Sequence, residues 1–215
     1  MTAKTGTGKY EELLARCRGL EPVTTAVAHP CEASALAGAV EAAAQGLIRP
    51  ILVGPTARIR GIAAAQGLDL GGMEIVDAAH SHDSASKAVD IVRQGGAELL
   101  MKGSLHTDEL LGAVLEREAG LRTARRVSHV FIMDVPTYHK VLVVTDAAIN
   151  IAPTLEDKVD ICQNAIDLTV ALGVARPRAA ILAAVETVTS RMPATIDAAA
   201  LCKMAQRGQI TGGIL

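Results

Sequence analysis

Short apolar runs alternate with longer, alanine-rich stretches through the first half of the chain. The strands are apolar without strict alternation, which indicates sheet faces that are both covered. Strands that alternate with helices pair in parallel through right-handed crossovers. The predicted strands are 23–28, 51–54, 73–78 and 97–101, and the predicted helices are 9–18, 31–46, 56–66, 81–96 and 108–118.

Local signals place several of the helix ends. Gly67 lies just past one helix, where a C-terminal cap belongs, and Gly95 and Gly96 stop another. Ser81 is a start signal for the helix 81–96, and Thr107 is predicted to cap the helix 108–118.

The pattern changes near residue 126. Residues 127–135 and 140–147 are two apolar runs joined by Pro-Thr-Tyr-His, which predicts a hairpin. Thr154 and Asp157 resemble a capping box ahead of a helix with a core-facing apolar stripe. A strand at 178–185 and a helix at 195–206 are also predicted. We therefore expect a first α/β domain at 1–126 and a second at 127–215.

Composition narrows the class of protein. Half of the 215 residues are hydrophobic, a fifth are charged, and aromatic residues are limited to one Phe and two Tyr. A globular protein with an aliphatic core is expected, without the aromatic platforms on which nucleic-acid bases stack. The net charge of −2 gives no reason to expect a nucleic-acid or membrane partner. Scattered cysteines and no secretory or membrane-spanning pattern suggest a cytoplasmic protein without a metal site.

The turn after the fourth predicted strand is the first candidate site. It contains Lys102, Gly103, Ser104, His106 and Thr107. Ligands of open α/β sheets bind beyond the carboxyl ends of the strands, and free amides at a helix start attract anions. The turn therefore suits a phosphate, although an ordinary βα loop with a glycine turn and a threonine cap explains the same residues. The order of residues differs from a Walker loop, and the TGTGK stretch at 5–9 follows no predicted strand.

Three further polar clusters are candidates with ordinary alternatives. Thr145, Asp146 and Asn150 follow a predicted strand and would either orient a substrate or hold their own loop. A second cluster follows the strand 178–185, and a third is a basic run that would either bind a nucleotide-like phosphate or be a solvated charge run. These two clusters are Glu186, Thr187, Thr189 and Ser190, and Arg122, Arg125 and Arg126.

Several long stretches together resemble the phosphate acetyltransferase and phosphate butyryltransferase family. They are MKGSLHTDELL, SHVFIMDVP, TDAAINIAPTLEDKVDICQNAIDL and ILAAVETVTSRMPATIDAAALCKMAQRGQITGGIL, in that order. The resemblance implies two α/β domains with a cleft between them, similar to isocitrate and isopropylmalate dehydrogenases. It also implies a homodimer or larger assembly. The family continues past the equivalent of Leu215 with a Ser-Arg motif and an Asp proposed as general base, so the C-terminal part is expected to be missing and the catalytic residues stay unassigned.

The same resemblance implies reversible transfer of an acetyl or butyryl group between coenzyme A and inorganic phosphate, by thiolate attack on an acyl phosphate in a ternary complex. Coenzyme A would be a substrate, and no bound cofactor or metal is expected. Lys102, Gly103, Ser104, His106 and Thr107 would bind substrate with Thr145, Asp146 and Asn150. Two alternatives remain, an inactive fragment acting as an interaction domain and a dehydrogenase of the same fold. The second lacks a G-x-G-x-x-G motif. Acyl chain length cannot be read from the sequence, because one methylene changes binding by only about 1–3 kcal/mol.

Overall fold

The computed structural model describes residues 8–215, so residues 5–7 of the TGTGK stretch lie outside the described part. The chain divides into two compact units. One comprises residues 13–123, and the other comprises residues 124–215 together with the start of the first helix as far as Glu12. The division into domains at 1–126 and 127–215, expected from the sequence, remains a prediction.

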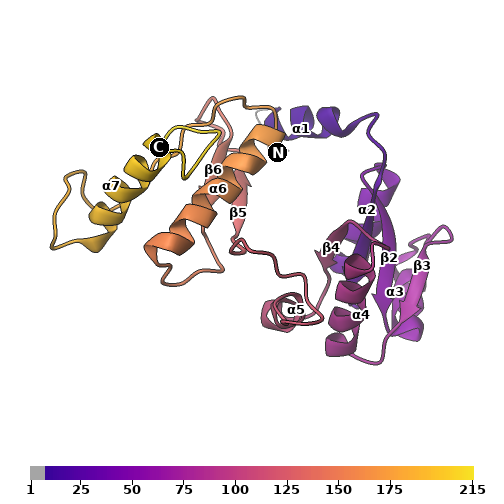
Figure 1. Ribbon diagram of the computed structural model, residues 1–215. Coiled ribbons are helices and arrows are strands. Elements are labelled where there is room, and N and C mark those ends of the chain that lie inside the picture. Colours follow the sequence, from indigo (N-terminus) through magenta and orange to yellow (C-terminus); the bar gives the residue numbers. More distant parts are fainter. Residues whose placement is uncertain (1–7) are drawn as a thin grey trace. The chain divides into compact units, whose positions relative to one another are not determined.

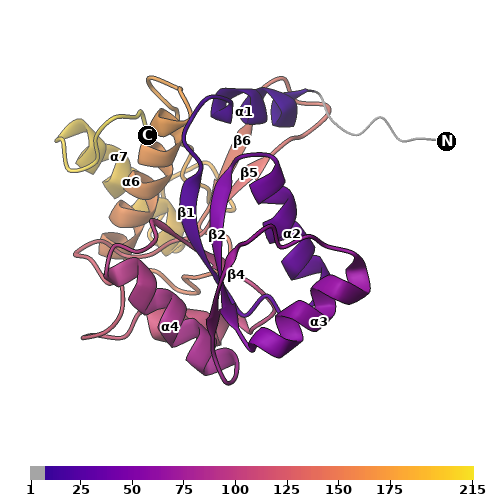
Figure 2. The ribbon, with the colours of Figure 1, turned by 90° about the vertical axis from the view of Figure 1, so that its right-hand side faces the viewer.

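The unit of residues 13–123 is built around a four-stranded parallel sheet with the strand order β3-β2-β1-β4 (Figure 1). Its helix α4 lies on one side of the sheet, and α2 and α3 lie on the other (Figure 2). Helix α5 packs against α4. The elements are α1 (Lys9–Cys17), β1 (Val23–Ala28), α2 (Ala33–Ala44), β2 (Ile48–Gly54), α3 (Thr56–Gln66), β3 (Glu74–Asp77), α4 (Ser81–Arg93), β4 (Leu99–Lys102) and α5 (Thr107–Val114).

The central position of β1 explains its composition. Ala26 and Ala28 pack in the core below α4 and α5, while Val27 between them packs in the core on the side of α2 and α3. All three side chains are fully buried, as expected for the alternating faces of a doubly covered strand. The four predicted βα repeats and their parallel pairing are confirmed.

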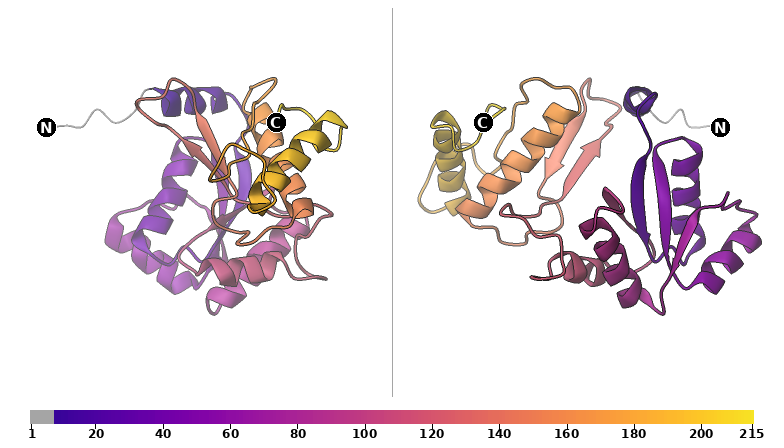
Figure 3. Two further views of the ribbon diagram at one scale, coloured as in Figure 1. Left: turned by 90° about the vertical axis from the view of Figure 1, so that its left-hand side faces the viewer. Right: turned by 45° about the vertical axis from the view of Figure 1, so that its right-hand side comes forward.

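The other unit contains a two-stranded antiparallel sheet, with α6 packed against it and α7 packed against α6 (Figure 3). Cys162 and Ile166 of α6 form a small core with Leu201 of α7 and Ile210. The predicted hairpin and the Thr154–Asp157 capping box are confirmed. The elements are β5 (Val130–Met133), β6 (Leu142–Thr145), α6 (Leu155–Ala171) and α7 (Pro193–Gln206).

The strand predicted at 178–185 is wrong. In its place the structure has only a single bridge between Arg178 and Ile214, in which the Ala179 amide donates to the Ile214 carbonyl. A strand requires a neighbour for its backbone groups, and the hairpin strands pair only with each other among the described residues. Leu182 is accordingly 86% exposed.

Two predicted helix starts and one predicted end also require correction. The residue that caps α5 is His106, and Thr107 is the first helical residue. The cap of α4 is likewise His80, whose Nδ1 accepts from the Asp83 amide, rather than Ser81. Helix α5 ends at Val114 instead of continuing to 118, because the chain folds back and the Leu121 amide donates to the Val114 carbonyl.

Candidate functional site

The strand order places a switch point between β1 and β4. Strands β1, β2 and β3 follow one another in one direction across the sheet, whereas β4 lies on the opposite side of β1. In open α/β sheets the loops that leave the two strands at such a point diverge, and ligands bind in the crevice beyond their carboxyl ends. The residues after β1 begin with His29, and those after β4 begin with Gly103. The first predicted candidate site therefore lies at the position where this fold binds ligands.

Gly103 lets the two loops approach each other closely. A Cβ at this position would lie 2.5 Å from the carbonyl oxygens of both Ala28 and His29. The Gly103 amide donates to the Ala28 carbonyl at 2.8 Å, and the Ser104 amide donates to the His29 carbonyl at 2.9 Å. These two amides continue the pairing of β4 with β1, so they are not available to an anion.

The Ser104 hydroxyl is also occupied by the protein. It donates to the His29 carbonyl at 2.9 Å and accepts from the Cys31 amide at 3.1 Å. The sequence suggested that Gly103 and Ser104 bind a phosphate directly. In the structure their amides and the Ser104 hydroxyl are hydrogen-bonded to the protein's own backbone. They join the loops that follow β1 and β4.

Lys102 places its side-chain nitrogen at this edge. Its ammonium donates to the Leu105 carbonyl at 2.7 Å and to the Gly103 carbonyl at 3.3 Å. A lysine ammonium has three donors, so one proton remains for a ligand. The side chain is folded back over its own loop, which limits the positions that this proton can reach.

The start of α5 supplies the donors that an anion requires. Thr107 and Asp108, the first two helical residues, are exposed, and neither of their backbone amides has a partner within an α-helix that begins there. His106 is exposed beside them, and its amide donates to Glu109 Oε2 at 2.9 Å. Within the predicted turn, the backbone amides without a helical or strand partner are therefore those of Thr107 and Asp108 rather than those of Gly103 and Ser104.

His29 is a residue of this edge that the sequence did not single out. It is the non-glycine residue among those described with a positive φ, at 56°, and it is 8% exposed. Its Nδ1 lies 2.9 Å from the Oγ of Ser84 in α4, and Ser84 is fully buried. Burial lowers the pKa of His29, and the nearby Arg58 lowers it further. A histidine directly after the predicted strand 23–28 was the one signal that the sequence carried.

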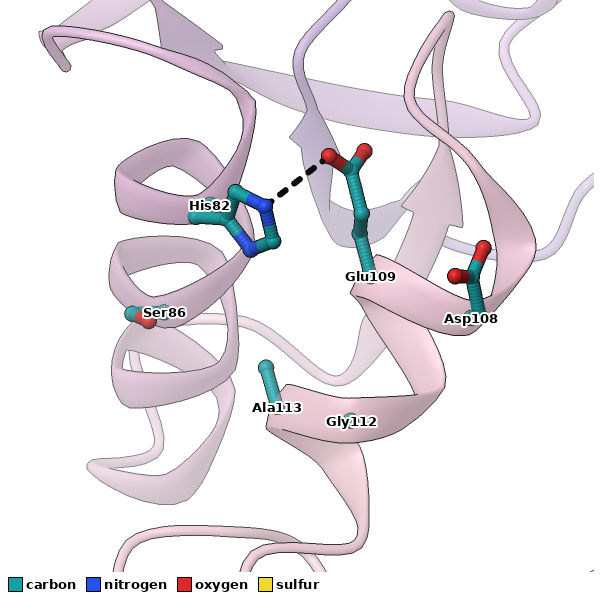
Figure 4. A pocket seen from close by; sticks show the side chains of 6 residues that line it. All are labelled: His82, Ser86, Asp108, Glu109, Gly112 and Ala113. Carbon is teal, nitrogen blue, oxygen red and sulfur yellow. Dashed lines mark ion pairs between the residues drawn. The ribbon is translucent and has the colours of Figure 1, made fainter.

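Glu109 links the first turns of α4 and α5, as Figure 4 shows. Its Oε1 accepts from Ser81 Oγ at 3.0 Å and lies 3.1 Å from His82 Nε2. The His106 amide, followed by the Ser81 hydroxyl, lowers the pKa of the Glu109 carboxyl. An open pocket of about 250 Å³ lies beside this link and includes Ser86, Asp108, Gly112 and Ala113 in its lining.

The second predicted cluster is a hydrogen-bonded loop in the other unit. The Asp146 carboxylate accepts from the amides of His129, Ala148, Ile149 and Asn150 and from the Asn150 side chain. Although burial opposes the charge, these donors lower the Asp146 pKa to about 2. A carboxylate with so many donors organises its loop and is a poor proton acceptor.

Thr145 and Asn150 are also hydrogen-bonded to backbone and side-chain groups around this loop. Thr145 donates from its hydroxyl to the His129 carbonyl at 2.8 Å, across the hairpin. The Asn150 side chain donates to the Val127 carbonyl at 3.0 Å and accepts from Arg126 Nε at 2.7 Å. All three predicted residues are thus brought together, and their hydrogen bonds fix the loop that follows β6.

The remaining predicted clusters are structural or exposed. Arg125 pairs with Asp167 of α6, and Arg126 pairs with Asp157, so both hold the segment before β5 to α6. Thr189 exchanges hydrogen bonds with Thr195 in the turn before α7. Four other members lie exposed at the surface and have no hydrogen-bond or ion-pair partner among residues 8–215: Arg122, Glu186, Thr187 and Ser190.

Two general properties concern residues 8–215. No three of their His, Cys, Asp or Glu side chains gather closely enough to bind a metal ion. Their helices are also too short or too polar to traverse a lipid bilayer.

Comparison with known proteins gives one family. Residues 78–214 match the family described as "Phosphate acetyl/butaryl transferase". The chain is 62% identical over 207 residues to a phosphate acetyltransferase of Rhizobium meliloti, covering 96% of this chain and 66% of the relative. It is 36% identical over 206 residues to a phosphate butyryltransferase of Clostridium acetobutylicum, covering 96% of this chain and 68% of that protein. The chain thus spans about two thirds of the length of these relatives.

Solved structures agree with the fold. A branched-chain phosphotransacylase from Enterococcus faecalis superposes with a TM-score of 0.71 at 26% identity, over 89% of this chain and 66% of the other. A phosphotransacetylase from Streptococcus pyogenes gives a TM-score of 0.74 at 16% identity, over 100% of this chain and 73% of the other. At that lower identity the likeness concerns the fold alone.

Proposed function

Because the chain belongs to the phosphate acetyl/butyryl transferase family, we propose that it carries out the reversible transfer of a short acyl group between coenzyme A and inorganic phosphate. The observation that supports this most is the 62% identity to a phosphate acetyltransferase, which extends over 96% of this chain. Coenzyme A, acyl phosphate and phosphate are then substrates rather than resident groups. A cytoplasmic homodimer arranged like isocitrate and isopropylmalate dehydrogenases, without nucleic-acid partners, belongs to the same proposal.

The proposed reaction begins with the coenzyme A thiol and an acyl phosphate. The sulfur attacks the carbonyl carbon, the bond from that carbon to the phosphate oxygen breaks, and the thiol proton ends on the released phosphate. A thiol of ordinary pKa is mostly protonated at neutral pH, so a proton acceptor accelerates the attack. Donors aimed at the developing oxyanion stabilise the transition state, and the loss of one costs about 3–4 kcal/mol.

Within this proposal the phosphate lies at the start of α5. The Thr107 hydroxyl, the amides of the first turn and the remaining proton of Lys102 supply the donors, and His106 lies beside them. Gly103 and Ser104 contribute by fixing the loop. Thr145, Asp146 and Asn150 act on the substrate through the shape of the loop after β6.

The test is an assay for thioester formation from acetyl phosphate and coenzyme A, and from butyryl phosphate and coenzyme A. The 215-residue chain and the Rhizobium meliloti relative are measured side by side. We expect turnover by both. Thr107→Ala should raise the KM for acyl phosphate several-fold, and Thr107→Ser, which keeps the hydroxyl, should restore it. No turnover by this chain under conditions in which the relative is active would contradict the proposal.

The two alternative functions have their own outcomes. A dehydrogenase would reduce a nicotinamide cofactor in the presence of a hydroxy acid, and the family comparison does not favour it. An inactive interaction domain would fold and bind without thioester formation. Neither alternative is supported by a specific contact among the described residues.

A further inference from the structure

The side-chain nitrogen of Lys9 is surrounded by three oxygens of the turn between β5 and β6. It donates to Asp134 Oδ1 at 2.9 Å, to the Val135 carbonyl at 2.8 Å and to the Tyr138 carbonyl at 2.7 Å. A lysine ammonium has three donors and no acceptor, so these oxygens take all of its donors. The Lys9 side chain is only 10% exposed. The one carboxylate and two carbonyls form an ammonium site, here called the turn site.

The turn site is made by the local sequence rather than by Lys9. The Tyr138 amide donates to the Val135 carbonyl at 3.1 Å and closes a turn whose second residue is Pro136. Proline favours this position because its ring fixes φ near the value that the turn requires. A carbonyl oxygen has two lone pairs, so Val135 accepts from Tyr138 and from Lys9 together. The oxygens should therefore keep their places when Lys9 is absent.

Helix α1 depends on contacts with the rest of the protein. It has nine residues and none of them is buried. A helix of this length is marginal on its own in water. Lys9 is the first helical residue, where a lysine opposes the helix dipole, so the stability of the helix does not explain its position. Lys9 belongs to the same compact unit as the hairpin, and its contact with the turn site fastens the start of α1 there.

An open pocket of about 410 Å³ adjoins this contact. Its lining comprises Lys9 and Glu12 of α1 and Pro136, Thr137, Tyr138 and His139 of the turn. Lys9 and Tyr138 belong both to the lining and to the hydrogen bonds of the turn site, so a small molecule in the pocket lies beside that site. Glu12 adds a second carboxylate to that of Asp134, which favours a cationic ligand.

We propose that the turn site binds primary ammonium groups, that Lys9 is its internal occupant, and that a protonated primary amine entering through the pocket replaces Lys9 and releases the start of α1. The exchange breaks three hydrogen bonds and forms three, without a covalent step. A tethered lysine has an effective concentration on the order of millimolar, so an external amine competes only at that concentration or above. The proposal is independent of acyl transfer.

The first experiment uses Lys9→Met, which removes the ammonium and retains a long, flexible side chain. Spectra of the whole chain are recorded during addition of methylammonium chloride, and again with tetramethylammonium chloride, at constant ionic strength. Methylammonium has three N–H donors and tetramethylammonium has none. The Tyr138 carbonyl is observed through the His139 amide in an HNCO spectrum. The Val135 carbonyl is observed through the Tyr138 amide that donates to it.

In Lys9→Met we expect saturable shifts with methylammonium and none with tetramethylammonium. In the wild-type chain the apparent Kd should be about tenfold higher or more, because Lys9 competes. Lys203→Met is the matched control, since Lys203 is exposed in the same unit and donates to Gln206 within α7. It should behave like wild type. Equal shifts with both cations in Lys9→Met, or one Kd for all three chains, would overturn the ammonium site.

The second experiment measures hydrogen exchange at the amides of residues 13–17, in the second half of α1. Lys9→Met should raise their exchange rates by about tenfold or more relative to wild type and to Lys203→Met. Methylammonium should also raise these rates in the wild-type chain, where no substitution can disturb the fold, and tetramethylammonium should not. Unchanged exchange in Lys9→Met, or equal effects of the two cations on wild type, would overturn the release of α1.

Discussion

Gly103 is the residue at which the loops after β1 and β4 come closest. A side chain there would collide with two carbonyl oxygens that belong to the backbone and cannot rotate away. Gly103→Ala should therefore lower the free energy of unfolding by about 1–3 kcal/mol, as overpacking in a core does. Urea denaturation measures this change.

Gly112 is the matched control for that substitution. It lies inside α5, and a Cβ there would meet no atom within 4 Å. Gly112→Ala should raise the free energy of unfolding by about 0.5–1 kcal/mol, because alanine restricts the unfolded chain and favours the helix. Equal effects of the two alanines would show that the close contact at Gly103 is not present in solution.

Asp146 makes the stability of its unit depend on pH at the acid end. Its folded pKa of about 2 lies below the usual 3.8, so the carboxylate stabilises the folded state fully above the unfolded pKa. That contribution falls as the pH decreases from about 4 towards 2. Asp146→Asn should lower the free energy of unfolding by about 1–3 kcal/mol at pH 7, which is typical of hydrogen bonds to a charged group. The variant's free energy of unfolding should also depend less on pH between 4 and 2.

Glu186 is a suitable control because its side chain is exposed in the same unit. Glu186→Gln should leave the unfolding profile between pH 2 and pH 7 close to that of wild type. If Asp146→Asn behaved in the same way, the loop after β6 would not depend on the carboxylate.

The N-terminal cap of helix α6 is the feature to test at the scale of a single element. Thr154 Oγ1 accepts from the Asp157 amide at 3.2 Å, and Asp157 accepts in return from the Thr154 amide at 3.0 Å. Thr154→Ala should lower the free energy of unfolding by about 1 kcal/mol, and Thr154→Ser should retain most of the wild-type stability. The readout is the urea midpoint together with hydrogen exchange at the Asp157 amide. An alanine variant with unchanged protection would exclude this cap.

The elements that the sequence predicted well have local causes. The apolar runs of β1 to β4, the αL glycine at 67 and the Thr154–Asp157 box each depend on neighbours in the chain. The strand predicted at 178–185 failed because pairing requires a partner from elsewhere in the fold, which an apolar pattern does not specify. The cap of α5 shifted from Thr107 to His106 because helix ends depend on individual side-chain bonds.

At the scale of the whole molecule, strand order determines which loops meet. The sequence placed Lys102, Gly103, Ser104, His106 and Thr107 at the end of a strand, and in the structure Lys102 ends β4 while the other four follow it. It could not show that β4 lies beside β1, nor that His29 is therefore part of the same edge. The donors that Gly103 and Ser104 use in joining the two loops were invisible for the same reason.

The most direct measurement of the central claim is a backbone ¹H–¹⁵N titration of the whole chain with inorganic phosphate, compared with sodium chloride at equal ionic strength. The amides of Thr107 and Asp108 should shift in a saturable manner, because they begin α5 at the switch point. The amides of Gly103 and Ser104 should shift little, because both are bonded to carbonyls of the β1 strand and loop. Saturable shifts elsewhere, with Thr107 and Asp108 unchanged, would contradict a phosphate site at this edge.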